Sequence, residues 1–509
     1  MKKYSGIMIT DSESIFYYWG CLMGSKMIII TIITVFMLFV GFNTSAYALT
    51  EEESVAIQSL LEDARRISGT PGMSVSIQSR DDTYFFSSGY ANSEEGILTN
   101  ENTIWELASV SKAFTALGIL LLEEQGFLSM DDSVVEYLPW FSLRYQGQPV
   151  DMQSVTLNHF LHHTTGLINR YHTQHIPEGN TPDMLQKTVE MLIDAEVVFP
   201  PGERYEYGTV NYDVLGLVIE TVSGQSFEDF MEEQVFRPLG LYETYANRGK
   251  VQATGQLAQG YRSAFFMTLP YDAPEFRGNT PAGYLFSSSQ DIARWMGIQL
   301  GIVEDIPEIF QGLIAKSHEG NRSVAAVDEL YYGAGWVVNA DQTFIQHAGG
   351  NPTFATNIFL FPEEQLGISL LSNSASTNID MLYNIKDILD GNISQSYQMS
   401  LMQISDIALS SATIALTLLA ILFFFLGVRR KKQNRKLPLT KKRLILIAFW
   451  LVTTIFIGIL CLILPTIFGA SWRSFLVWQT YSYLTALIAL SLLSASITWF
   501  VYCYRYKCS

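Results

Sequence analysis

Three long apolar runs in the last hundred residues constrain this chain more than any other feature of its sequence. Residues 407–427 contain no charged side chain, and two further runs cover about 444–464, which ends at Pro465, and about 477–500. Each run is long enough to cross about 30 Å of hydrocarbon as a helix. A helix also satisfies its own backbone hydrogen bonds, as lipid surroundings require. We therefore expect residues 401–509 to form a domain of three transmembrane helices.

The charge of the first connecting loop predicts how these helices are oriented. Residues 429–443 carry nine Lys and Arg side chains, and such loops stay on the cytoplasmic side of a membrane. The third run then ends on the same side, near Arg505 and Lys507, and residues 49–400 face outward. The sequence thus predicts a multi-pass protein of the cytoplasmic membrane, in contact with membrane lipid, with its main domain extracytoplasmic.

Another apolar run lies near the N-terminus, at residues 27–42. Lys26 precedes it and an Ala-Tyr-Ala site follows it at 46–48, which is the pattern of a secretory signal peptide cleaved after that site. Met23 is the more ordinary start for such a peptide, so residues 1–22 are interpreted as an upstream extension without a structural role. The alternative is a retained anchor. The signal peptide independently places the main domain outside.

Charge divides the chain into the same three segments. Residues 1–48 have a formal charge of +1, residues 49–400 of −29 and residues 401–509 of +11. The acidic segment repels polyanions, which excludes nucleic acid as a partner. Its sign agrees with a neutral or cationic substrate, although acidic exported proteins in general share it. No cysteine occurs in this segment, so it folds without disulfides or thiolate-bound metal.

The outward domain, residues 49–400, has strand patterns at both ends and helical patterns between them. Residues 73–78 and 84–86 predict a hairpin. From Ser109 the spacing of apolar side chains predicts a helix that Gly126 ends. Further strands are predicted later, at 335–338, 344–346, 358–361 and 367–371. This order predicts an α/β domain whose sheet combines strands from both ends of the segment.

Ser109-Val110-Ser111-Lys112 is the one Ser-x-x-Lys sequence in the chain. Residues i and i+3 share a helix face, so Lys112 can reach the hydroxyl of Ser109. Apolar surroundings favour the neutral amine, which can accept a proton. The helix N-terminus adds partial positive charge beside a developing alkoxide. A serine nucleophile needs such help, whereas the alternative is a capping serine beside a surface lysine.

Two further patterns are weak by themselves. Tyr207 precedes an apolar helix at 213–224, where a phenol can carry a proton or simply pack, and packing is favoured from this residue alone. His347-Ala348-Gly349-Gly350 lies between two predicted strands. Its small residues leave room for a substrate backbone along a strand edge.

In this order the three patterns resemble serine β-lactamases and penicillin-binding proteins, more narrowly their class-C-like branch, peptidase family S12. The resemblance covers nearly all of residues 52–375 and includes the segments 163–167, 199–202, 212–216 and 333–336. It implies an antiparallel sheet flanked by helices, with an inserted mainly helical subdomain. It also implies an acyl-enzyme on Ser109, proton exchange by Lys112 and Tyr207 in an order that stays open, and an oxyanion hole from the backbone N–H groups of Ser109 and Gly350.

The resemblance also assigns substrate-binding positions. His347 stands where many relatives have lysine, an exchange that weakens the anchoring of a substrate carboxylate, and Gly349 follows on the same strand. Thr209 replaces the asparagine of the usual Tyr-x-Asn motif, which argues against an ordinary β-lactam or D-Ala-D-Ala substrate.

A narrower likeness is to prodrug-activating peptidases of nonribosomal peptide and polyketide pathways, of which the colibactin-maturation peptidase is one. It extends to segments 143–149, 211–216, 350–352 and 472–478 and to the three membrane helices. Those enzymes remove an N-acyl-D-asparagine cap outside the cytoplasmic membrane as the product is exported. The likeness implies that Thr209 and Asn351 bind the D-asparagine side chain, and that Asn279 takes the place of an assisting histidine. It implies a small acyl-peptide substrate and an export transporter as a candidate partner.

Other functions stay open at this stage. A cell-wall DD-carboxypeptidase, a D-alanyl esterase or a β-lactamase-like hydrolase shares the three motifs, although the −29 charge argues mildly against polyanionic teichoic acid. A β-lactam sensor that signals through its membrane helices is a third reading. No cofactor is expected, and no metal, because no carboxylate at helical spacing accompanies the histidines at 159, 162 and 163.

Overall fold

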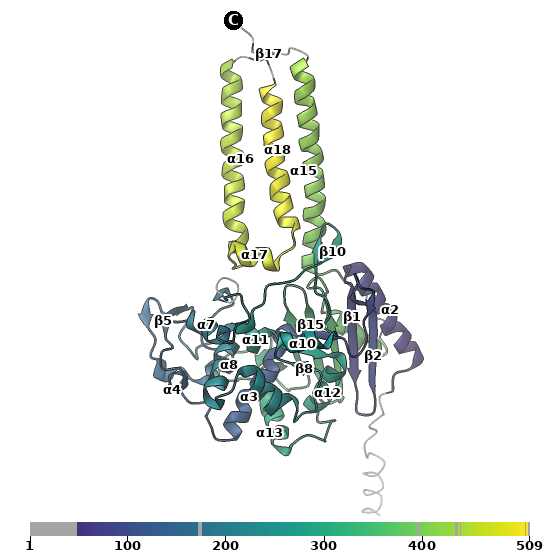
Figure 1. Cartoon of the computed structure of the whole chain (residues 1–509), viewed down its shortest axis with the longest axis vertical. Coiled ribbons are helices and arrows are strands. Elements are labelled where there is room, and N and C mark those ends of the chain that lie inside the picture. Colours follow the sequence, from purple (N-terminus) through teal and green to yellow (C-terminus); the bar gives the residue numbers. More distant parts are fainter. Residues whose placement is uncertain are drawn as a thin grey trace, which may run out of the picture. The chain divides into compact units, whose positions relative to one another are not determined.

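The computed structural model describes residues 48–171, 176–392, 396–432, 436–437, 439–503 and 505–506. Both interpretations of the N-terminal segment, the cleaved signal peptide and the retained anchor, fall on residues outside this part. Residues 49–509 form one compact unit, and Figure 1 shows its helices and strands.

The largest sheet has eight strands in the order β12-β13-β14-β15-β16-β1-β2-β3, and every neighbouring pair is antiparallel. The sheet therefore combines strands from both ends of the domain, as the sequence predicted. Its strands are β1 (Gly72–Gln78), β2 (Thr83–Asn92), β3 (Ile97–Leu98), β12 (Leu330–Tyr332), β13 (Val337–Asn339), β14 (Ile345–Gly350), β15 (Ala355–Phe361) and β16 (Leu366–Ser372).

Helices cover both faces of this sheet. Every residue of β16 and of its neighbour β1, two inner strands of the sheet, is buried, which requires apolar cover on both sides. On one side α2 (Glu51–Ser68) and α14 (Met381–Leu389) pack together and onto the sheet. On the other, α12 (Ser289–Gln299) packs on β1 and β16.

The segment between β3 and β12 is mainly helical, and α3 (Ser111–Glu124) lies at its centre. All α3 residues from Ser111 to Leu122 are buried, and a helix that is apolar on every side is enclosed by others. Its neighbours include α8 (Val210–Ser223), α11 (Thr280–Gly283) and α13 (Glu308–Ser317). The inserted helical subdomain is thus present. Among the described residues, this segment also contains α4 (Val134–Tyr137), α5 (Leu157–Leu161), α7 (Met184–Glu190), α9 (Phe227–Phe230) and α10 (Arg248–Thr254).

Short strands link these helices in small sheets. One joins β4 (Ile104–Glu106), β11 (Phe286–Ser288) and β8 (Thr244–Tyr245). A second joins β5 (Leu143–Tyr145), β6 (Gln148–Pro149) and β7 (Ala195–Val197), and a two-stranded hairpin consists of β9 (Tyr261–Ala264) and β10 (Met267–Pro270).

Two local expectations need correction. His347 to Gly350 do not lie between two strands but form most of β14, because these residues pair in register with β15 as far as Gly350. Ser109 is not the first residue of the α-helix: it lies in the 3₁₀ turn η1 (Ala108–Val110), and α3 begins at Ser111.

Three C-terminal helices are long and apolar enough to cross a membrane: α15 (Leu401–Lys432), α16 (Leu439–Ile467) and α18 (Ser482–Tyr502). They lie side by side in Figure 1, and α18 contacts both of the others.

The ends of two of these helices differ from the prediction. Pro465 does not end α16 but lies in its last turn. Proline has no N–H, so the carbonyl of Cys461 loses its helical hydrogen bond. That carbonyl instead accepts a hydrogen bond of 2.9 Å from the Trp472 indole. The third span begins at 482 rather than 477, since residues Trp472–Trp478 form the short helix α17 with Ser471 as its N-cap.

Candidate active site

Ser109 sits in a tight turn directly before the central helix. The preceding residue, Ala108, has φ of +49°, in the left-handed region that non-glycine residues seldom adopt. The chain leaves β4 after Glu106 and reaches Ser109 in η1. Between them, the carbonyl of Leu107 accepts a hydrogen bond of 2.7 Å from Thr356 on β15. The backbone directly before Ser109 is therefore attached to the sheet.

Two groups meet the hydroxyl of Ser109. The Nζ atom of Lys112 and the Oη atom of Tyr207 each lie 3.1 Å from its Oγ atom. The amine is also 5.2 Å from the centroid of the Tyr207 ring. The structure therefore brings these three sequence-predicted residues together, with both proton-carrying groups within hydrogen-bond reach of one hydroxyl.

Lys112 is fully buried, at 0% exposure. Besides Ser109, its Nζ donates to the carbonyl oxygen of Ala282 on α11, at 2.6 Å. Thr115, one turn along α3, donates to the carbonyl of Pro281 at 2.7 Å. These two bonds attach α11 to α3, so the segment that ends at Gly283 borders the candidate nucleophile.

The loop that carries Tyr207 is held by the buried residue His163. The Nδ1 atom of His163 accepts hydrogen bonds from the side-chain amide of Asn211, at 3.0 Å, and from the backbone N–H of Gly208, at 3.4 Å. Its ring centroid is 4.4 Å from that of Tyr207. Burial, together with the positive charge of Lys112, lowers the pKa of His163 well below its usual value. A neutral imidazole therefore holds the backbone directly after Tyr207.

Strand β14 has one free edge next to this cluster. It pairs with β15 from Ile345 to Gly350, but with β13 only at Ile345 and Gln346. A Cβ atom at Gly349 would lie 2.4 Å from the Thr356 hydroxyl and 2.7 Å from the Leu107 carbonyl, whereas one at Gly350 would meet nothing. Glycine at 349 thus allows β14 to cross the Ser109 turn closely, and Gly350 borders open space.

His347, on this strand, has both ring nitrogens engaged. Its Nδ1 atom lies 2.8 Å from the Ala348 carbonyl and must donate there, so its Nε2 atom accepts from the Tyr332 hydroxyl at 3.1 Å. Burial and the charge of Lys112 lower the pKa of His347 to about 3. The side chain is therefore neutral at ordinary pH and offers no positive charge to a substrate carboxylate.

Asn351 directs its amide nitrogen into the protein. That nitrogen donates to Glu106 Oε1, at 2.5 Å, and to the Gly283 carbonyl, at 2.8 Å. Glu106 is 3% exposed and also accepts from Arg248 at 3.1 Å. Burial raises the pKa of Glu106, against the lowering effects of Arg248 and Asn351. Because both donor positions of Asn351 are used, only its carbonyl oxygen remains for a ligand.

Asn279 repeats this arrangement from the other side. Its amide nitrogen donates to both carboxylate oxygens of Asp213, at 2.9 and 2.7 Å, and both residues are fully buried. Burial raises the pKa of Asp213 well above its usual value. Within the described part of the chain, the carbonyl oxygen of Asn279 accepts no hydrogen bond.

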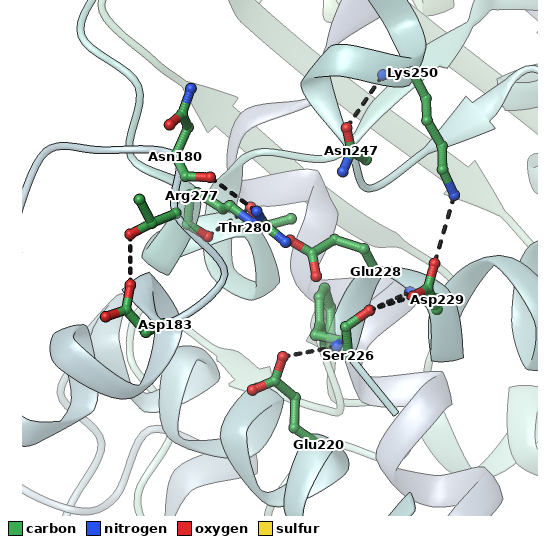
Figure 2. A network of polar contacts seen from close by, with 12 residues as sticks. Asn180, Asp183, Glu220, Ser226, Glu228, Asp229, Asn247, Lys250, Arg277 and Thr280 are labelled. Carbon is green, nitrogen blue, oxygen red and sulfur yellow. Dashed lines mark hydrogen bonds and ion pairs between the residues drawn. The ribbon is translucent and has the colours of Figure 1, made fainter. Parts of the chain in front are cut away.

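A polar network holds the turn η4 (Arg277–Asn279), which presents this asparagine. Arg277 donates to Glu228 at 2.7 Å and to the Asn180 carbonyl at 2.8 Å, and Thr280 donates to the Arg277 carbonyl at 2.8 Å. Figure 2 shows these contacts joining residues from separate elements.

The two amide oxygens face each other across Gly283. A Cβ atom built at Gly283 would lie 3.6 Å from Asn279 Oδ1, 3.8 Å from Asn351 Oδ1 and 3.9 Å from the backbone of Ala108, the neighbour of Ser109. The arrangement thus places two hydrogen-bond acceptors around a small space beside the candidate nucleophile. Thr209 lies at the N-cap of α8 and is 7% exposed, and its N–H donates to Asn169 at 3.0 Å.

A family comparison agrees with this geometry. Residues 57–392 match the model of the Beta-lactamase family. The chain belongs to the beta-lactamase family. Members of this family are generally serine hydrolases, and the matched segment contains all of the candidate site residues described above.

One relative is similar to this beta-lactamase family member over more than the segment 57–392. Protein flp of Staphylococcus aureus (strain MRSA252) is 28% identical over 445 residues, which are 84% of this chain and 86% of that protein. Penicillin-binding protein 4* of Bacillus subtilis (strain 168) is 29% identical over 335 residues, 62% of this chain and 71% of that one.

Solved structures of beta-lactamase relatives have the same fold. The octameric penicillin-binding protein homologue of Pyrococcus abyssi is similar, with a TM-score of 0.56 and 26% identity over 67% of this chain and 78% of that one. A beta-lactamase/D-alanine carboxypeptidase of Pseudomonas syringae has the same TM-score at 19% identity, over 67% of this chain and 99% of that one, which shows the fold alone.

Proposed function

We propose that this chain is a membrane-anchored, extracytoplasmic serine hydrolase that acts through an acyl-enzyme on Ser109. The Ser109 oxygen attacks the carbonyl carbon of the scissile amide, and its proton passes to Lys112 or Tyr207. The same groups then protonate the departing amine, and water later releases the acyl group by the reverse transfer. The observation that supports this proposal is the convergence of two proton carriers, each 3.1 Å from one hydroxyl oxygen.

We assign the oxyanion hole to the backbone N–H groups of Ser109 and Gly350, and the alignment of the substrate to the free edge of β14 at His347 and Gly349. An oxyanion hole works because fixed donors point to where negative charge develops. The open space next to Gly350 supports its assignment.

We propose that the acyl part of the substrate is an N-acyl-D-asparagine cap on a small nonribosomal peptide or polyketide. Asn279 and Asn351 both present carbonyl oxygens while their own donors are occupied, so the space between them suits a group with two N–H donors. A primary amide has such a group, and its own oxygen would accept from the Thr209 hydroxyl. Each unmade bond in such a site costs about 1–3 kcal/mol, which favours the amide over apolar analogues.

A free substrate carboxylate fits this site poorly. His347 is neutral, and two further acceptor oxygens would face the anion. The segment of residues 49–400 also carries a formal charge of −29. These features favour the cap-removing function over a DD-carboxypeptidase, whose substrate ends in a carboxylate.

A substrate panel tests this assignment. The purified full chain in lipid nanodiscs is given N-myristoyl-D-asparaginyl anilide, its D-alanyl analogue, a D-Ala-D-Ala peptide and a chromogenic cephalosporin. The expected result is fastest cleavage of the D-asparaginyl anilide and no cleavage by the Ser109→Ala variant. Faster cleavage of the D-Ala-D-Ala peptide or the cephalosporin would contradict the cap-removing function and favour a cell-wall or lactamase function.

The proposed location is the cytoplasmic membrane, with α15, α16 and α18 as the spans and the hydrolase domain outside. Nine basic residues in 429–443 support this orientation. In this arrangement an acyl chain on the substrate can stay in the outer leaflet while its cap reaches Ser109.

A further inference from the structure

The β9–β10 hairpin, residues 261–270, carries exposed apolar side chains. Phe266, Met267 and Leu269 are 52, 58 and 42% exposed. Arg262 is the one charged residue in the hairpin. Exposing such a cluster of apolar side chains to water is unfavourable. Exposed apolar clusters mark surfaces that another protein or a membrane covers.

The turn of this hairpin has an unusual sequence for its backbone. Phe265 and Phe266 have φ of +53° and +61°, the two left-handed positions of a two-residue turn that normally takes Asn-Gly or Asp-Gly. Two bulky aromatic residues in these positions are unfavourable in the folded backbone. Contacts outside the turn must therefore favour phenylalanine there.

The tip of the hairpin is bonded to the ends of two membrane helices. The N–H of Phe266 donates to Asp406 on α15, at 3.2 Å, and the N–H of Phe265 donates to Ser482 on α18, at 3.4 Å. The Ser482 hydroxyl donates in turn to Asp406. Asp406 is 3% exposed and is the one acidic residue in 401–509. It lies directly before the uncharged run 407–427, at the boundary where a hydrocarbon layer would begin.

The base of the hairpin is fixed to the same helices. The guanidinium of Arg262 lies between the rings of Tyr271 and Tyr481, 4.8 and 4.2 Å from their centroids. It also donates to the carbonyl of Leu476 on α17, at 2.5 Å. Such a stacked, hydrogen-bonded cation holds a rigid position, so the hairpin cannot easily move away from the helix ends.

We propose that the tip of the β9–β10 hairpin enters the outer leaflet of the membrane, where Phe266 and Met267 contact lipid acyl chains. Lipid is the occupant because the exposed side chains continue the apolar surface of α15 and α18 at the start of their spans. The tip then anchors the segment that continues from Pro270 to Asn279 of the candidate site. The inference rests on the proposed membrane insertion of the three helices, and not on the proposed substrate.

Site-directed spin labelling tests this inference in the full chain in nanodiscs. The four native cysteines are replaced by alanine, and single cysteines are introduced as Phe266→Cys and, separately, Met267→Cys. Two controls match them: Leu462→Cys, 75% exposed on α16, and Phe127→Cys, 62% exposed near the Glu123–Lys316 ion pair. Each label is measured for collisions with oxygen, which concentrates in lipid, and with a water-soluble nickel chelate.

The expected result is that labels at 266 and 267 lose nickel accessibility and gain oxygen accessibility, as at 462 and in contrast to 127. Nickel accessibility at 266 and 267 equal to that at 127, with 462 in lipid, would overturn the hairpin proposal alone. A water-like label at 462 would overturn the membrane insertion as well. Spin–spin broadening at 266 that disappears on dilution with unlabelled protein would identify a second copy of the chain as the occupant, and would also overturn the proposal.

Discussion

Two asparagine amides near Ala108, the neighbour of Ser109, have orientations that buried carboxyl groups fix. Glu106 holds the nitrogen of Asn351, and Asp213 holds that of Asn279. Reversing either amide would replace its N–H donors with an oxygen that faces a buried carboxyl group, at a cost of about 1–3 kcal/mol or more. In the proposed function, Glu106 and Asp213 are positioning residues for specificity that do not touch the substrate themselves.

Gly283→Ala tests this space directly. The added Cβ would contact both amide oxygens at ordinary van der Waals distances of 3.6 and 3.8 Å, so we expect a folded protein whose KM for the D-asparaginyl substrate rises about tenfold, the equivalent of one lost hydrogen bond of about 1.4 kcal/mol. Gly312→Ala, where a Cβ meets nothing within 4 Å, is the control and should not change KM. An unchanged KM for Gly283→Ala would place the substrate side chain elsewhere.

The neutral state of His347 gives a pH prediction. Its pKa is about 3 in the folded protein, below the usual 6.5, so the unfolded chain binds more protons between these values. The contribution of this pKa shift to the free energy of unfolding is complete above pH 6.5. It decreases as pH falls toward 3, by up to about 1.4 kcal/mol per pH unit. We expect the unfolding temperature to fall less between pH 7 and pH 5 in His347→Gln than in the wild-type chain. Equal pH dependence would mean that the pKa of His347 is the same in the folded protein as in the unfolded chain.

At the scale of elements, α3 is enclosed by helices and by the turn between β12 and β13. Gly335, in that turn, has φ of +78°, and a Cβ there would lie 2.5 Å from the Cα of Ala113 on α3. Gly126, just after α3, has a similar φ of +76°, but a Cβ there would meet nothing. A comparison of the two glycines thus separates the effect of the left-handed backbone, which both share, from the effect of close packing, which only Gly335 has.

Alanine at these two glycines should have different effects. Gly126→Ala adds only left-handed strain, about 1–2 kcal/mol. Gly335→Ala adds the same strain and a clash with backbone, which typically costs about 1–3 kcal/mol more. We expect a lower unfolding temperature for Gly335→Ala than for Gly126→Ala, and lower activity because α3 carries Lys112. Equal unfolding temperatures would show that the turn moves away from α3 without cost.

The elements with a clear local pattern could be predicted from the sequence. Strand alternation at 73–78 and the apolar helical run at 213–224 are local signals, and the sheet built from both ends of the domain followed from the order of the predicted elements. The end of α16 was misjudged because a proline in the last turn of a helix is tolerated when a distant side chain, here Trp472, satisfies the freed carbonyl. That contact has no local signal.

The parts of the candidate site that have a local pattern could likewise be predicted from the sequence. Ser109 and Lys112 are one helical turn apart, so their contact follows from their spacing. Tyr207 was named from a family pattern. The catalytic roles of all three residues stay predictions. Glu106 and Asp213 were missed because they meet Asn351 and Asn279 across 245 and 66 residues of sequence. No periodicity reports such pairs. The left-handed Ala108 was also missed, since alanine is not a typical residue for that conformation.

The whole molecule combines an acidic domain of the beta-lactamase family with three long apolar helices. Residues 49–400 carry a formal charge of −29 and residues 401–509 one of +11, and nine of the basic residues lie in 429–443. In the proposed topology these nine residues form the cytoplasmic loop.

The orientation of the chain can be measured in cells. In the cysteine-free background, Leu437→Cys lies in the basic loop and Phe127→Cys in the hydrolase domain. A membrane-impermeant maleimide should label position 127 in intact cells, and position 437 only after lysis. Labelling of 437 in intact cells would reverse the proposed topology.

Trapping the covalent intermediate tests the account most directly. The full chain in nanodiscs is mixed with N-myristoyl-D-asparaginyl anilide, quenched in acid within milliseconds, digested and analysed by mass spectrometry. The expected result is one acyl adduct, on the peptide that contains Ser109, with no adduct and no turnover in Ser109→Ala and much slower adduct formation in Tyr207→Phe. Continued turnover by Ser109→Ala, or an adduct on another residue, would contradict the account.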